Sequence, residues 1–89
     1  MALRDVLQRD LQEAMRQRAE VRRDALRMAL TAIKNAEVEA GAPLDDAAVQ
    51  RLLQREIKQR REAIAEFARG NRPDLVAKEQ AEIDVLQAY

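Results

Sequence analysis

The sequence predicts an all-α protein that folds as a small four-helix antiparallel bundle with short loops. Hydrophobic residues make up 47% and charged residues 36% of the 89 residues, with only two Gly and two Pro, which is typical of a helix-rich chain. Apolar residues also recur at spacings of three and four in four separate stretches, the period of one helix face. A chain of this length buries a single core, so we expect one domain over residues 1–89.

The first two helices are predicted from their apolar pattern and from the signals that end them. The first is expected at about residues 3–17, where Leu3, Val6, Leu7, Leu11, Ala14 and Met15 share one face. The second is expected at about 21–40, on Leu26, Ala29, Leu30, Ile33 and Ala36. Gly41 can adopt the left-handed conformation that closes a helix, and Pro43 prevents its continuation.

The third and fourth helices have specific start signals. Asp45 can accept the free amide hydrogens of a new helix, and Leu44 can pack on Val49 as a hydrophobic staple. The third helix is therefore expected at 46–69, ending at Gly70. Pro73 and Asp74 suit a first helical turn, so the fourth helix is expected at about 73–88. Short connections between these helices favour antiparallel neighbours.

The residue types that are missing exclude most enzyme chemistry. The chain contains no Cys, His or Ser, so neither a Ser/His/Asp-type nor a Cys/His-type nucleophile can be assembled. Carboxylates alone would suit only hard metal ions, and no Gly-rich phosphate loop is present. We therefore expect no catalytic residue, no metal site, no cofactor and no enzyme activity of the chain on its own.

Charge and hydropathy indicate where the protein works. The N-terminal stretch MALRDVLQRDL reaches Arg and Asp by its fifth residue, so it lacks the apolar core of a secretory signal. No apolar run approaches the length of a transmembrane helix. We expect a cytoplasmic protein without a membrane partner. The formal net charge is zero, so binding of a polyanion requires local segregation of charge.

Two opposite charges of the third helix are predicted to face the core. Arg60 lies within the apolar side of that helix, with Glu56 one turn earlier. Glu79 and Glu37 border the apolar sides of the fourth and second helices, so they are expected to complete a ring of acceptors around Arg60. One interpretation is a structural ion network that sets helix packing. The other is a carboxylate cluster that binds a metal or a substrate amine.

A second set of charges forms a stripe on the third helix. Arg51, Arg55, Lys58 and Arg61 share another side, and residues 51–61 hold Glu56 as their single acidic residue. Such a stripe is a candidate nucleic-acid contact through phosphates, or simply a solvated Arg-rich face. Another basic cluster, Arg16, Arg18, Arg22, Arg23 and Arg27, is diluted by nearby acids. No aromatic residue interleaves the cations, so stacking of single-stranded bases is not expected.

Two blocks of the sequence carry a family resemblance, LRMALTAIKNAEVEAG and REIKQRREAIAEFARGNRPDLVAKEQAEIDVLQAY. They resemble the YqeY family, which is related to the C-terminal tail region of the B subunit of the tRNA-dependent amidotransferase. The resemblance implies an all-helical protein, of which this chain matches the N-terminal four-helix part. Matching motif residues, none of them expected to be catalytic, are Arg55, Glu56, Lys58, Gln59, Arg60, Asp74, Glu79 and Glu82.

Two functions from different classes follow. The resemblance implies a non-catalytic accessory domain associated with tRNA or with tRNA-dependent amidation, a carbon–nitrogen ligase reaction with glutamine as the amido donor. The alternative is a protein-interaction or self-association module without an RNA role. The expected partners are accordingly tRNA, an amidotransferase or another protein, or a second copy of the chain.

Overall fold

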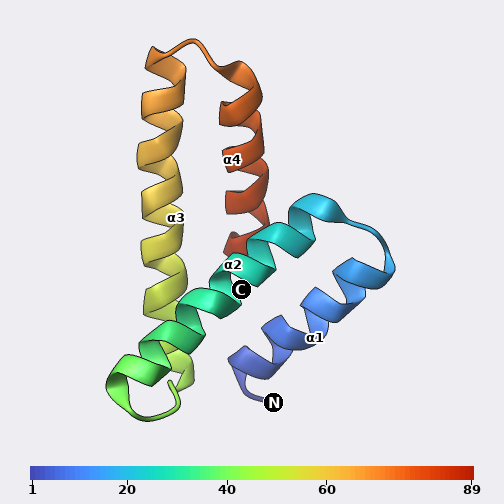
Figure 1. Ribbon diagram of the computed structural model, residues 1–89, viewed down its shortest axis with the longest axis vertical. Coiled ribbons are helices and arrows are strands. Elements are labelled where there is room, and N and C mark those ends of the chain that lie inside the picture. Colours follow the sequence, from blue (N-terminus) through green and yellow to red (C-terminus); the bar gives the residue numbers. More distant parts are fainter.

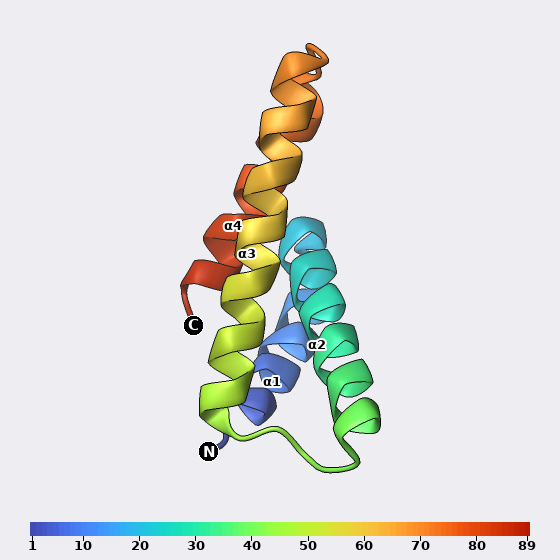
Figure 2. The same cartoon turned by 90° about the vertical axis from the view of Figure 1, so that its left-hand side faces the viewer.

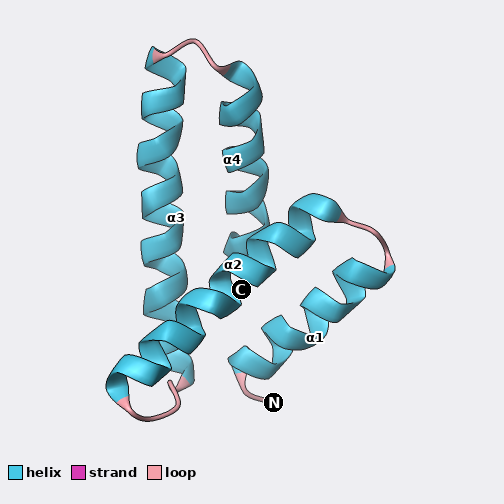
Figure 3. Ribbon diagram, in the orientation of Figure 1, coloured by secondary structure: helices cyan, strands magenta, loops and turns pink.

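The computed structural model describes residues 1–89 and contains four helices and no strand (Figure 3). The helices are α1 (Leu3–Arg16), α2 (Glu20–Ala40), α3 (Asp46–Arg69) and α4 (Pro73–Gln87). The predicted all-α fold class is confirmed. The helix ranges expected from the sequence differ from these bounds by no more than one residue at either end.

The four helices form two antiparallel hairpins that cross at an angle. Figure 1 shows α1 and α2 lying obliquely across the base of the upright α3–α4 hairpin. In the rotated view of Figure 2, the ends of α3 and α4 that meet at their connecting turn extend beyond the other two helices. Helix α2 is the central element, because it packs against α1, α3 and α4. The molecule consequently measures 41 × 30 × 19 Å.

The core draws apolar side chains from all four helices. Leu7 of α1, Leu26 and Ile33 of α2, Leu53 of α3 and Leu86 of α4 are fully buried or nearly so. Each burial of this kind removes apolar surface from water, which is the main force that holds a small bundle together. Because α2 packs against α1 on one side and against α3 and α4 on the other, the core is continuous from α1 to α4.

Local capping contacts define the helix ends. Gly41 has φ of +70°, and its amide donates to the Glu37 carbonyl at 2.9 Å. The Asp45 side chain accepts from the Ala48 amide at 2.8 Å, as an N-cap does. Asp46 accepts from the amide of Leu3 at 3.0 Å, which joins the start of α1 to the start of α3. No helix has both the length and the apolar character needed to cross a membrane.

Candidate nucleic-acid interface and buried ion pair

Arg60 is a buried cation at the centre of the contact between α3, α4 and α2. It is 6% exposed, and its Nη2 atom lies 3.3 Å from Glu82 Oε2 on α4. Its Nη1 atom lies 4.0 Å from Glu56 Oε2 on its own helix. Nη2 also donates to the sulfur of Met28 on α2 at 3.6 Å. The guanidinium therefore contacts three helices, but its buried Nε has no hydrogen-bond partner.

The carboxylate opposite Arg60 is also buried. Burial raises the pKa of Glu82 above its ordinary value, and the positive charge of Arg60 only partly opposes this effect. Removing two charges from water is costly unless their contacts are good. Arg60 makes one close contact with Glu82, and its Nε lacks a partner. The pair therefore contributes little net stability, although it fixes how α3 packs against α4.

Two of the acidic partners predicted for Arg60 are wrong. Glu79 forms no ion pair with Arg60, whose partner on α4 is Glu82. Arg60 lies nine residues before the end of α3 and Glu82 nine residues after the start of α4. In an antiparallel hairpin these positions are level with each other. The periodicity used for the prediction identifies a helix face but leaves the level along the axis open.

Glu37 is committed to a different part of the structure. Its Oε1 lies 3.0 Å from Arg4 Nη2 on α1, and its Oε2 accepts from the Leu44 amide at 2.9 Å. It therefore holds the loop before α3 against the α1–α2 hairpin. No group of three or more carboxylates in the chain is arranged to hold a metal ion, and Glu37 takes no part in the contacts around Arg60.

The predicted cationic stripe lies on the outer side of α3. Its four residues, Arg51, Arg55, Lys58 and Arg61, are all exposed, and none forms an ion pair within the chain. We call these four residues the cationic surface. Glu62, also exposed, ends the run. The surface is thus the local segregation of charge that polyanion binding requires in a protein of zero net charge.

Several cations of the second basic cluster, which surrounds the turn between α1 and α2, form ion pairs within the chain. Arg16 pairs with Glu13 at 2.6 Å, and Arg23 pairs with Asp24 at 3.0 Å. Arg22 lies 3.7 Å from Asp10. Because most of its charge is compensated by neighbouring carboxylates, this cluster is a weaker candidate for anion binding than the cationic surface.

A groove that the sequence did not indicate adjoins the cationic surface. It has a volume of about 360 Å³ and lies between α3 and the end of α4. Its rim is polar, with Gln50, Gln54, Arg61, Gln87 and Tyr89, and its floor is apolar, with Leu53, Ile57 and Leu86. We call it the amide groove. Arg61 belongs both to this groove and to the cationic surface.

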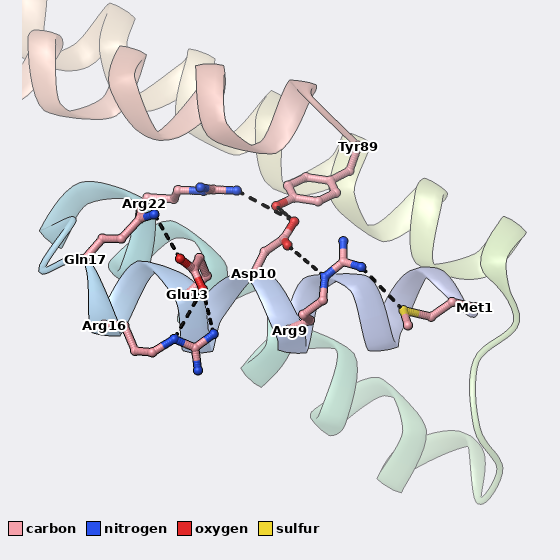
Figure 4. Close-up of polar contacts among 8 residues, drawn as sticks. All are labelled: Met1, Arg9, Asp10, Glu13, Arg16, Gln17, Arg22 and Tyr89. Carbon is pink, nitrogen blue, oxygen red and sulfur yellow. Dashed lines mark hydrogen bonds and ion pairs between the residues drawn. The ribbon is translucent and has the colours of Figure 1, made fainter.

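Tyr89 is held in place by contacts with two distant segments. Its hydroxyl donates to Asp10 Oδ2 at 2.6 Å, and its carbonyl accepts from Gln50 Nε2 at 2.6 Å. Figure 4 shows Tyr89, Asp10 and Arg22 pointing toward one another. The Tyr89 hydrogen bond lowers the pKa of Asp10, whereas burial and the same hydrogen bond raise the pKa of Tyr89. Although no aromatic residue interleaves the cations in sequence, the fold places Tyr89 on the groove that Arg61 also lines.

Comparison with known proteins gives the chain a family. The family model described as Yqey-like protein matches residues 4–89. The chain belongs to the YqeY family. The predicted resemblance is therefore confirmed, and it covers nearly the whole chain.

Several proteins of similar sequence share the name altered inheritance of mitochondria protein 41, mitochondrial. The match is 39% identical over 84 residues in Lachancea thermotolerans, covering 93% of this chain and 45% of the relative. In Saccharomyces cerevisiae it is 39% identical over 85 residues, with 94% and 46% covered. In Eremothecium gossypii it is 38% identical over 84 residues, with 93% and 46% covered. This YqeY-family chain thus spans somewhat less than half the length of these relatives.

The relatives correct the predicted location. We expected a cytoplasmic protein because the first residues lack an apolar leader, but the matching proteins are named as mitochondrial. The cytoplasmic prediction is therefore wrong. An apolar leader is the signal of secretion, so its absence carries no information about mitochondrial import, which uses amphipathic, Arg-rich segments.

Proposed function

We propose that this YqeY-family chain is a non-catalytic RNA-binding accessory domain that holds tRNA by its phosphate backbone. One observation carries the proposal: four exposed cations lie together on α3 without a carboxylate partner in the chain. Unpaired Arg and Lys side chains at such a surface can neutralise phosphates and release counterions, which is the main source of sequence-independent affinity for nucleic acids.

The choice of tRNA as the bound RNA comes from the resemblance of the YqeY family to the tail of the tRNA-dependent amidotransferase. The chain offers no nucleophile or base of the required type, since it lacks Cys, His and Ser. Its role beside glutamine-dependent amidation is therefore to position tRNA, while the carbon–nitrogen bond is made elsewhere.

The test is a fluorescence-anisotropy titration of labelled bulk tRNA at several salt concentrations. The variant Arg51→Gln/Arg55→Gln/Lys58→Gln removes three charges of the cationic surface. The matched control, Arg16→Gln/Lys34→Gln/Arg69→Gln, removes three exposed cations elsewhere on the protein. Each lost phosphate contact should reduce the slope of log affinity against log salt by about 0.7–0.9, so the surface variant should lose about 2–3 units.

Two outcomes decide the question. A lower affinity and a flatter salt dependence in the surface variant, with the control unchanged, support the proposal. If the unmodified chain does not bind tRNA near physiological salt, or if both variants lose affinity equally, the cationic surface is a solvated face. A protein partner or a second copy of the chain is then the ligand to seek.

A further inference from the structure

The amide groove contains hydrogen-bonding groups that the fold itself does not use. Gln17, Gln50 and Gln80 donate hydrogen bonds within the chain, but the amides of Gln54 and Gln87 have no such partner. Both side chains are exposed and line the same groove. Each amide offers a donor and an acceptor side by side, the pattern that matches the edge of a nucleobase.

The floor and one end of the groove suit a flat ring. Leu53, Ile57 and Leu86 form an apolar floor, and Tyr89 lies at the rim. The hydrogen bonds of Tyr89 to Asp10 and Gln50 hold this residue in one position. A preorganised site loses less conformational entropy on binding. The volume of about 360 Å³ is at the small end of ligand pockets, which suits a single base.

The position of the groove connects it to the cationic surface. Arg61 borders the groove and is also the last cation of that surface. Gln54 lies one turn after Arg51 and one turn before Lys58 on the same helix. A nucleotide whose phosphate contacts the cations is therefore within reach of the groove with its base.

We propose that the amide groove binds an unstacked nucleobase of an RNA strand whose phosphates lie on the cationic surface. This inference rests on the proposed function and adds a base contact to it. Single-stranded loops and ends are the parts of an RNA that can present such a base, because bases in a helix are stacked and paired. The groove thereby favours single-stranded segments over continuous duplex.

The experiment compares two labelled strands of equal length and charge, a short oligoadenylate and an abasic ribose-phosphate strand, titrated with the full chain by anisotropy. A good base contact should make the oligoadenylate bind about tenfold more tightly. The variant Gln54→Ala/Gln87→Ala should abolish this difference and leave the salt dependence unchanged. Gln59→Ala is the control, because Gln59 is an exposed glutamine of α3 outside the groove.

The outcomes separate this inference from the proposed function. If the unmodified chain binds both strands with equal affinity, or if the double variant still discriminates between them, the amide groove does not bind a base. The proposal that the cationic surface binds phosphates is then unaffected. If the unmodified chain binds neither strand, both the base contact in the amide groove and the proposed RNA-binding function are overturned. Circular dichroism of each variant checks that the fold is retained, which is expected because all three substituted glutamines are exposed.

Discussion

Replacing Arg60 with Met removes the one buried cation of the core and leaves Glu82 without its partner. Met matches the length of the aliphatic part of Arg, so the change removes the charge and the donors while filling much of the same space. The Glu82 carboxylate, whose nearest cationic atom in the native protein lies 3.3 Å away, then loses its ion-pair partner while it remains buried. The expected result is a folded but less stable protein.

The magnitude follows from the geometry of the pair. Removing one member of a buried ion pair costs about 3–5 kcal/mol. Here Arg60 makes a single close contact with Glu82, and its buried Nε lacks a partner, so its removal also relieves a penalty of about 1–3 kcal/mol. The net loss is about 2 kcal/mol, which corresponds to a decrease in Tm of about 8–16 °C for a domain of this size.

The loss should depend on pH. Burial raises the pKa of Glu82 in the folded protein above its ordinary value of 4.5. A raised pKa contributes stability below the unfolded pKa, and this contribution is lost as the pH rises through the folded pKa. Without Arg60 the charged form of Glu82 is still less favourable. The stability of the Arg60→Met variant should therefore be closest to that of the native protein in mild acid and furthest below it at neutral pH.

Thermal unfolding followed by circular dichroism, below and above the ordinary glutamate pKa, measures these effects. The companion variant Arg60→Met/Glu82→Leu removes both charges, and it should recover to within about 1 kcal/mol of the native protein or exceed it. If the single variant is as stable as the native protein at neutral pH, or if the double variant loses more than the single one, the buried pair does not govern the packing of α3 against α4.

Two further substitutions test contacts at the ends of the helices. Tyr89→Phe removes the donor to Asp10 and should lower the free energy of unfolding by about 1 kcal/mol. Because that hydrogen bond lowers the pKa of Asp10, the variant loses stability at pH values above the unfolded pKa of Asp10, and its acid unfolding, followed by circular dichroism, should begin at a higher pH. An unchanged acid midpoint would contradict the assignment. Asp45→Ala removes the side chain that caps α3 through the Ala48 amide and should lower the free energy of unfolding in urea by about 1 kcal/mol. Asp45→Asn, which keeps the acceptor, is the matched control and should lose much less.

Part of the candidate site was accessible from the sequence. The four cations of the cationic surface share one side of a helix whose period is read directly from its apolar residues, and the structure places all four in solvent. Glu56 was identified as the neighbour of Arg60 for the same reason, since both belong to one helix. The amide groove was missed because its walls come from residues 50–61 and 86–89, which are distant in the chain.

The sequence by itself determined the four helices, their limits and the side of α3 that carries Arg60 toward the core. These features depend on local rules: a period of 3.6 residues, a left-handed Gly41, an Asp45 cap and Pro73 in a first turn. Only the tertiary structure decided that Arg60 meets Glu82 rather than Glu79, that Glu37 pairs with Arg4, and that Tyr89 reaches Asp10 and the amide groove. The physical reason is that helix periodicity specifies the direction of a side chain, whereas the level and angle at which two helices meet depend on how their surfaces pack together.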